Sequence, residues 1–283
     1  MTPAVSRSAR LRAALGDHTV VLPGAFNALT ARAIEQAGFE AIYLSGAALA
    51  NGTLGVADIG LTTLSEAACH AARCAAVTSV PIIADADTGV GGPENAARCV
   101  AEFERAGLSG LHLEDQEFPK RCGHLAGKSL VPVHEFCEKI AAASAARRDP
   151  DLLIIARTDA RGVTSYDDAV ARAQAYLGAG ADAIFPEALA SREELGRFAR
   201  DVRAPLLANM TEFGRTPYLS VADFTALGYR MVVFPVTLQR IAMKAVAGAL
   251  QELKARGTQK DMLERMQTRQ ELYDLLGYEG KVS

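Results

Sequence analysis

The chain alternates short apolar runs with helix-like segments from one end to the other, and this alternation restricts it to very few folds. The runs are rich in Val, Ile, Leu and Ala and occupy residues 19–25, 40–46, 80–87, 110–116, 152–158, 182–187, 204–211 and 230–236. Continuous apolar strands separated by helices indicate a parallel sheet that is covered on both faces. Eight such units predict an α/β fold of the (β/α)₈ barrel type, and 283 residues suit one barrel of about 250 residues.

Several residues mark where the helices begin and end. Asn27 is placed to cap a helix that ends before Gly38. Thr63 and Glu66 form a capping-box pattern at the start of another helix. Residues 6–12 are rich in Arg and lack acids, as transit peptides do, but a short amphipathic helix is the favoured interpretation. Because no linker interrupts the pattern, we expect a single domain over residues 1–283, with residues 258–283 as a C-terminal helical extension.

Charge, hydropathy and cysteine usage exclude several classes of protein. A net charge of −3 offers no basic surface for nucleic acid. No apolar run reaches the ~20 residues that a membrane span needs. The five cysteines include no Cys-x-x-Cys pair, so they indicate neither a zinc cluster nor a disulfide framework. We therefore expect a cytoplasmic enzyme in which Cys69, Cys74, Cys99 and Cys137 are small core residues on helices.

Polar residues collect where the predicted strands end, which is the catalytic face of a (β/α)₈ barrel. They are Ser45, Gly46, Asp85, Asp87, Glu114, Asp115, Arg157, Thr158, Asp159, Glu187, Asn209 and Thr211, with Cys122 in the loop after the fourth strand. Each one could instead be a solvated or helix-capping residue. Their shared position favours an active site.

Asp85 and Asp87 are candidate metal ligands. Two positions apart on a strand, they point to the same side and can reach one point at the strand end. Two close carboxylates repel each other unless a cation joins them, and a small set of oxygen ligands suits Mg²⁺ or Mn²⁺. Asp58 and Glu114 could contribute through bridging waters. The alternative is that Asp87 only caps a helix or braces a loop.

Residues 120–124 surround a thiol with positive charge. Lys120, Arg121 and His124 would all favour the thiolate form of Cys122, which makes it a candidate nucleophile or proton donor. The plain alternative is a basic surface loop that happens to contain a cysteine. The neighbouring Gly127-Lys128-Ser129 resembles part of a phosphate-binding loop, but the spacing of its glycines is one residue short, so we reject a nucleotide site.

Three arginines could bind an anionic substrate. Arg157 follows the fifth strand, Arg240 follows the eighth, and Arg269 lies in the C-terminal segment. A substrate with more than one carboxylate would match several guanidinium groups around a metal. Taken singly, each arginine could equally form a surface ion pair.

With these residues in place, the chain resembles the isocitrate lyase and phosphoenolpyruvate mutase superfamily, and within it the 2-methylisocitrate lyases. The resemblance covers nearly the whole chain. It is carried by motifs at residues 23–25, 43–46, 85–89, 112–116, 120–124, 156–159, 185–188, 209–214, 266–269 and 271–273. It implies Mg²⁺-dependent cleavage of a 2-hydroxy tricarboxylate to pyruvate and succinate, a step of propionate catabolism in the methylcitrate cycle.

The resemblance also implies a role for each site residue. Cys122 would protonate the succinate half as general acid, Tyr43 would help to remove the hydroxyl proton, and Arg157 would stabilise charge near the metal. The substrate-binding residues would be Ser45, Gly46, Ala47, Gly123, His124, Arg157, Glu187, Asn209, Met210, Thr211, Arg240 and Arg269. The family forms homotetramers whose last helices exchange between subunits, which would explain the C-terminal extension.

Some residues depart from the methylisocitrate lyase pattern. Ala47 replaces a common glycine, Glu117-Phe118-Pro119 looks more like the dimethylmalate lyase branch, and Val233 stands where a leucine often lines the methyl pocket. Alternative substrates are therefore 2,3-dimethylmalate, isocitrate or another substituted malate. A phosphonate-branch mutase or an oxaloacetate decarboxylase is less favoured, because the mutases lack a thiol acid at Cys122. A barrel used only for binding is disfavoured by the intact Asp85, Asp87 and Cys122 set.

Overall fold

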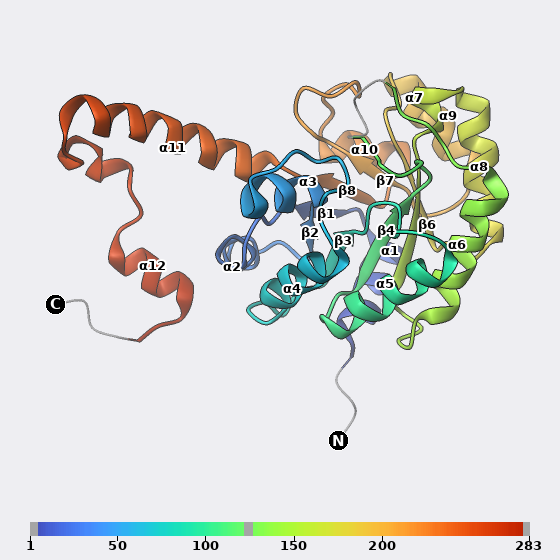
Figure 1. Ribbon diagram of the computed structural model, residues 1–283, viewed down its shortest axis with the longest axis horizontal. Helices are drawn as coiled ribbons and strands as arrows, with labels where there is room; N and C mark the ends of the chain where they lie inside the picture. The colour runs from blue at the N-terminus through green and yellow to red at the C-terminus, as the bar shows by residue number, and fades with distance from the viewer. Residues whose placement is uncertain (1–4, 122–126, 280–283) are drawn as a thin grey trace.

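The computed structural model describes residues 5–121 and 127–279 and shows a closed ring of parallel strands (Figure 1). The strands of this part of the chain are β1 Val20–Pro23, β2 Ile42–Leu44, β3 Ile82–Asp85, β4 Gly110–Glu114, β5 Leu153–Thr158, β6 Ala183–Pro186, β7 Leu207–Asn209 and β8 Met231–Phe234. Strands β2 to β6 pair in sequence order, and β1, β8 and β7 form the rest of the ring. Parallel bridges from Gly24 to Tyr43 and from Ile184 to Leu206 join the two groups. The predicted barrel is confirmed, with each strand shorter than its apolar run.

The helices lie around the ring, at its two ends and in a C-terminal arm. They are α1 Arg7–Asp17, α2 Ala28–Gln36, α3 Gly46–Leu49, α4 Leu64–Ala75, α5 Pro93–Arg105, α6 Val133–Ala146, α7 Ala160–Val163, α8 Tyr166–Gly178, α9 Arg192–Asp201, α10 Val221–Leu227, α11 Thr237–Arg256 and α12 Arg269–Leu276. The Asn27 side chain accepts a hydrogen bond from the Thr30 N–H at 2.8 Å, and Thr63 forms its capping box with Glu66. Both predicted helix starts are confirmed.

Two apolar layers lie on either side of the strands because side chains alternate along each strand. Inside the ring, residues such as Ile83, Ile155 and Phe185 pack on one another, and Leu11 and Leu15 of α1 close the amino-terminal end. The alternate strand positions pack outward against the helices. The inward positions continue at the carboxyl end as polar residues: Asp85, Glu114, Arg157, Glu187 and Asn209. The alternation of side chains along each strand therefore directs these polar residues into the carboxyl-terminal mouth of the barrel.

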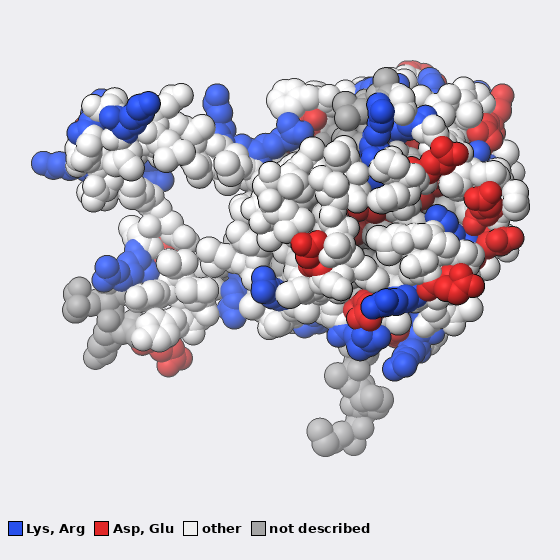
Figure 2. All heavy atoms as spheres, in the orientation of Figure 1, with Lys and Arg blue, Asp and Glu red and all other residues white. Residues whose placement is uncertain are grey.

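The chain after β8 leaves the barrel as an arm (Figure 1). Helix α11 projects outward and exposes Ile241 on one side and an apolar stripe made of Met243, Val246, Leu250 and Leu253 on the other. A 3₁₀ turn, Lys260–Arg265, leads to α12, where the Leu276 carbonyl oxygen accepts a hydrogen bond from Arg32 of α2 at 3.2 Å. On the face drawn in Figure 2, charges of both signs are interspersed over the barrel side farther from the arm, and groups of Lys and Arg alternate with uncharged areas on the arm. Within residues 5–121 and 127–279, no helix is long and apolar enough to cross a membrane.

Helix α3 follows β2 directly and leads into a π-helical turn, Ala50–Leu54; the Ser45 side chain accepts a hydrogen bond from the Ala48 N–H at 3.3 Å at the start of α3. The expectation for the helical cysteines needs correction. Among the helical cysteines, Cys74 and Cys99 are buried as expected, but Cys69 is exposed and Cys137 is half-buried. Cys69 lies on the outer side of its helix, whereas Cys137 still packs against the edge of the core.

Candidate active site

The carboxyl ends of the strands surround a cavity of about 480 Å³. Many of the residues predicted for the site line it together: Tyr43, Ser45, Ala47, Asp58, Asp85, Arg157, Glu187, Asn209, Thr211 and Arg240. They come from distant parts of the chain and meet because the carboxyl ends of parallel barrel strands share one face. The polar mouth that the sequence predicts is therefore one continuous hollow.

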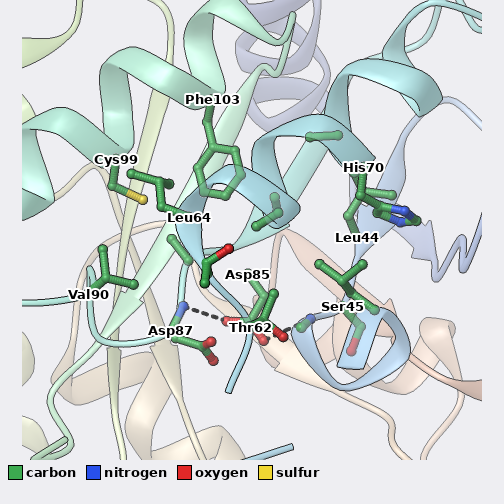
Figure 3. A pocket seen from close by; sticks show the side chains of 17 residues that line it. Leu44, Ser45, Thr62, Leu64, His70, Asp85, Asp87, Val90, Cys99 and Phe103 are labelled. Atoms are coloured by element: carbon green, nitrogen blue, oxygen red, sulfur yellow. Dashed lines mark hydrogen bonds between the residues drawn. The ribbon is translucent and has the colours of Figure 1, made fainter. Parts of the chain in front are cut away.

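Asp85 and Asp87 direct their carboxylates to one point beside Gly46. A Cβ atom on Gly46 would lie 3.0 Å from Asp85 Oδ2 and 3.5 Å from Asp87 Oδ1. Asp85 accepts hydrogen bonds from the Gly46 N–H at 3.2 Å and from the Asp87 N–H at 3.0 Å (Figure 3). Asp87 holds a left-handed backbone, with φ of 48°, which a non-glycine residue keeps only where its surroundings enforce it. The predicted convergence of the two carboxylates is present.

A smaller cavity of about 30 Å³ lies behind this pair, between β3 and helices α4 and α5 (Figure 3). Its wall carries His70, Cys99 and Phe103. Burial lowers the pKa of His70 and raises the pKa of the Cys99 thiol to about 12, so both side chains are neutral near pH 7. Apart from Asp85 and Asp87 themselves, the side chains that line this cavity are therefore uncharged.

Lys120 adds a buried cation to the aspartate cluster. Its Nζ lies 2.8 Å from Asp87 Oδ1 and also pairs with Asp58. Burial opposes the charge of this ammonium group, but Asp87 and the other nearby carboxylates outweigh burial and raise its pKa. The sequence suggested Lys120 as a cation for the Cys122 thiol, whereas the structure places its charge on carboxylates from two other loops.

The two aspartates differ in their affinity for a proton. Burial opposes ionisation of Asp85, but His112, Lys120 and Arg157 outweigh it and lower the pKa of its carboxyl group. Burial and repulsion by Asp85 raise the pKa of Asp87 to about 6, although Lys120 lowers it. An added cation would stabilise the doubly ionised pair.

Asp85 and Asp87 could hold a metal ion that takes few protein ligands, such as Mg²⁺. Within residues 5–121 and 127–279, no three His, Cys, Asp or Glu side chains are grouped to hold a metal ion. Mg²⁺ usually keeps several waters and takes only one or two carboxylates. The buried Oε1 atom of Glu114 has no hydrogen-bond partner among the described residues, and it is available to a metal-bound water. Asp85 and Asp87 are the residues that would hold the ion.

Tyr43 and His112 form a buried pair beside Asp85. The Tyr43 hydroxyl lies 2.7 Å from His112 Nε2, and this nitrogen lies 3.6 Å from Asp85 Oδ1. Burial lowers the pKa of His112 to about 4, so the imidazole is neutral near pH 7. Burial and Asp85 raise the pKa of Tyr43, so the phenol keeps its proton. We assigned no role to His112 from the sequence; the available signal was its inward position two residues before Glu114.

Arg157 lies at the centre of an acidic cluster on the opposite wall. Its Nε is 3.0 Å from Asp159 Oδ2 and 3.4 Å from Glu114 Oε2, and Nη2 is 3.3 Å from Glu187 Oε2. Burial opposes its charge, but these three carboxylates raise its pKa further. Glu187 also accepts a hydrogen bond from Asn209 Nδ2 at 3.1 Å. The guanidinium group is a fixed cation at the mouth.

Arg240 lies on the rim of the cavity, where two neighbouring residues hold it. Its Nε is 3.4 Å from Glu212 Oε2, and its guanidinium lies over the Phe213 ring at 5.4 Å. The Phe213 N–H donates to the Tyr218 hydroxyl at 2.8 Å. The seventh-strand loop therefore fixes a second cation that faces the same cavity.

Other predicted site residues lie elsewhere. Met210 is buried in the outer apolar layer, because it follows the inward-facing Asn209 and so points to the opposite side. Arg269 begins α12 in the arm and does not line the cavity of its own chain (Figure 1). In the single chain, neither Met210 nor Arg269 is therefore a residue of this cavity.

Cys122, Gly123 and His124 lie outside the described residues. The Gln116 side chain holds Arg121, the residue before them, through two backbone hydrogen bonds of 2.9 Å.

Comparison with known proteins gives concordant matches. The sequence pattern of the phosphoenolpyruvate phosphomutase family matches residues 11–254. A 2-methylisocitrate lyase of Aeropyrum pernix is 54% identical over 92% of this chain and 83% of its own length. A solved 2,3-dimethylmalate lyase superposes with a TM-score of 0.92 at 40% identity, covering 97% of this chain and 93% of that one. A phosphonopyruvate hydrolase solved with oxalate and Mg²⁺ superposes with a TM-score of 0.87 at 33% identity. The match covers 96% of this chain and 95% of that one.

Proposed function

Because the chain belongs to the isocitrate lyase and phosphoenolpyruvate mutase superfamily, we propose that it is a carbon–carbon lyase that cleaves 2-methylisocitrate to pyruvate and succinate. The observation that carries the proposal is the meeting of Tyr43, Asp85 and Arg157 at one cavity, with His112 bonded to Tyr43 and Asp87 next to Asp85. The name of the Aeropyrum pernix relative supports the choice of substrate.

The proposed reaction breaks one carbon–carbon bond. The hydroxyl proton leaves, the oxygen electron pair forms the carbonyl of pyruvate, and the bond electrons move to the carbon beside a carboxylate of the succinate half. That carbon then gains one proton, so the atoms of the substrate equal those of pyruvate and succinate. Two proton transfers at opposite sides of the broken bond are required.

Mg²⁺, or Mn²⁺ in its place, is the proposed cofactor. Asp85 and Asp87 would hold it directly, with Asp58 and Glu114 acting through water, and it would supply Lewis-acid stabilisation of charge on the substrate oxygens. The phosphonopyruvate hydrolase solved with Mg²⁺ supports this proposal.

The chain supplies the two proton transfers and the charge that binds the substrate. Tyr43 would accept the hydroxyl proton while passing its own to the neutral His112 Nε2, which is 2.7 Å away. Cys122 would give the second proton to carbon as general acid. Arg157 is a permanent cation and would orient a substrate carboxylate near the reacting atoms.

The remaining contacts divide between the two halves of the substrate. Ser45, Gly46 and Ala47 would bind the pyruvyl carboxylate beside the metal ligands. The succinate half would meet Gly123, His124, Glu187, Asn209, Thr211 and Arg240. Arg269 stays in this proposal only as a residue that another copy of the chain contributes.

A comparison of three substrates tests the function. We would supply Mg²⁺ with 2-methylisocitrate, isocitrate or 2,3-dimethylmalate and measure kcat/KM for release of the 2-oxo acid. The highest value is expected for 2-methylisocitrate. A clearly higher value for either competitor would refute the proposed substrate, and no turnover of any of them would refute the lyase itself.

We further propose a cytoplasmic homotetramer that acts in the methylcitrate cycle of propionate catabolism. Residues 1–283 would form one domain, with residues 258–283 as an extension that exchanges between subunits. Two apolar surfaces support the exchange: the exposed stripe on α11 and a groove of about 420 Å³ lined by Val21, Pro23, Ile34, Phe39 and Phe234. An apolar stripe and an apolar groove on one chain are complementary when copies associate.

A further inference from the structure

Lys128 belongs to a segment that returns to the barrel beside β4. The Val131 N–H donates to the Asp115 carbonyl oxygen at 3.0 Å, and the Glu117 N–H donates to the Ser129 carbonyl oxygen at 2.9 Å. An antiparallel bridge pairs Gln116 with Leu130. These backbone contacts fix the segment next to the strand that carries Glu114. They leave the Lys128 side chain only 2% exposed, beneath the surface.

The Lys128 ammonium group binds Asp159. Its Nζ lies 2.6 Å from Asp159 Oδ1, and the Asp159 side chain is 0% exposed. The Asp159 N–H also donates to Asp115 Oδ1 at 2.9 Å, so both the backbone and the side chain of Asp159 are held. A buried carboxylate needs such partners, because an unpaired buried charge is strongly destabilising.

Asp159 is also the main partner of Arg157. Arg157 Nε donates to Oδ2 at 3.0 Å, and Nη2 donates to Oδ1 at 3.2 Å, which fixes the plane of the guanidinium group. Oδ1 is therefore shared between Arg157 and Lys128. The two cations divide the charge of one carboxylate.

We propose that Lys128 is a positioning residue that acts through Asp159 to orient Arg157 and keep its charge available to the substrate. The inference rests on the proposed function, in which Arg157 binds a substrate carboxylate. Asp159, Glu114 and Glu187 all face Arg157 and weaken the positive potential that its fixed charge presents to an anion. Lys128 offsets one of these acids. Without it, Arg157 would be drawn further onto Asp159, and its planar group would turn away from the mouth.

A double-mutant cycle between Lys128 and Arg157 tests the inference. Lys128→Met is expected to lower kcat by between about 10- and 100-fold, as loss of supporting contacts around a reactive centre does. In an Arg157→Lys background the same change should have little further effect, because the group that Lys128 orients has gone. Lys128→Arg keeps the charge and should lose less than about 10-fold. Arg98→Met removes an equal charge from an exposed site on α5 and serves as the control.

Additive losses in kcat would overturn the inference, as would wild-type kcat in Lys128→Met. If Lys128→Met fails to fold, the double variant Lys128→Met/Asp159→Asn removes both members of the ion pair, and its kcat should fall as in Asp159→Asn alone. The urea midpoints of the two single variants and the double variant need no substrate, and they should be strongly non-additive. Additive midpoints would also overturn the inference. If the wild-type protein turns over none of the substrates, the proposed function is refuted. The coupling between Lys128 and Asp159 can still be measured from the urea midpoints.

Discussion

Burial decides the chemistry of single residues at the mouth of the barrel. His112 would titrate near pH 6.5 in water, but burial lowers its pKa to about 4 and makes it a neutral partner for Tyr43. Lys120 keeps its charge although it is buried, because carboxylates surround it. A residue type alone predicts neither outcome, since the pKa follows from the neighbours that folding supplies.

Cys122 is expected to be the proton donor to carbon. Cys122→Ser should keep the fold and Mg²⁺ affinity but lower kcat by more than about 100-fold, because a hydroxyl is a much weaker acid than a thiol. Calorimetric Mg²⁺ binding and single-turnover product release measure the two properties. Cys69→Ser changes an exposed thiol and is the matched control. Wild-type turnover in Cys122→Ser would exclude the mechanism.

Phe213 is expected to position Arg240. It is 85% exposed and has a left-handed backbone with φ of 60°, so neither burial nor backbone preference explains an aromatic residue there. Phe213→Leu removes the ring beneath the guanidinium and should raise KM about two- to fivefold at unchanged kcat. Phe213→Tyr keeps the ring and should retain the wild-type KM. Equal KM values in steady-state assays of all three proteins would contradict this role.

His70 is expected to make stability depend on pH. Burial, with a smaller contribution from Arg73, lowers its pKa below 6.5. The unfolded chain then binds this proton more readily, so the free energy of unfolding falls as pH drops below 6.5. His70→Gln should reduce the difference in urea midpoint between about pH 7 and about pH 5.

His18 is expected to change the pH dependence of stability in the opposite direction to His70. Its hydrogen bond to Glu40 raises its pKa, so its stabilising contribution is present at low pH and is lost as pH rises through the folded-state pKa. His18→Gln should therefore enlarge the difference in urea midpoint between about pH 7 and about pH 5, which His70→Gln reduces. Changes of the same sign in the two variants would refute the assignment.

The ends of the strands and the starts of the helices determine where the site residues lie. Strands deliver inward side chains with a period of two, and helix starts fix the loops between them. Helix α4 begins directly beside the aspartate pair, since Thr62, Thr63 and Leu64 line the small cavity behind Asp85 and Asp87. The start of α4 therefore contributes to the stability of the fold and also forms part of the wall behind the two aspartates.

The capping box of α4 is expected to stabilise the fold measurably. Thr63→Ala removes the side chain that accepts the Glu66 N–H, and it should lower the free energy of unfolding by about 1 kcal/mol. Thr63→Ser keeps the hydroxyl group and should remain close to wild type. Urea denaturation of the three proteins measures both values, and an unaffected Thr63→Ala variant would show that the cap is dispensable.

The whole molecule, as a single chain, leaves two apolar surfaces exposed. Its arm carries an apolar stripe into solvent, and the barrel leaves an apolar groove beside β1 and α2. Exposed apolar surfaces of this kind are typical of association sites. They are the reason to expect that α11 packs on another copy.

Disruption of the α11 stripe tests that assembly. Leu250 is 60% exposed in the single chain, so Leu250→Glu should be harmless in a monomer but should dissociate an oligomer that buries it. Light scattering should give a tetramer for wild type and a smaller species for the variant. Gln251→Glu adds the same charge at the adjacent exposed position and should leave the mass unchanged. An unchanged mass for Leu250→Glu would contradict the proposed interface.

The sequence by itself determined the barrel and most of its polar mouth. Apolar runs and helix caps are local patterns, and the period of two then assigns Asp85, Glu114 and Arg157 to the interior without reference to distant residues. The same reasoning identified Asp85 and Asp87 as a converging pair.

Tertiary structure alone decided which charges share a partner and which residues leave the site. Lys128 meets Asp159 across 31 positions, and Lys120 meets Asp58 across 62. Long flexible side chains select such partners by proximity after folding, and sequence spacing carries no record of that distance. For the same reason only the folded chain showed that Arg269 lies on the arm, away from its own cavity.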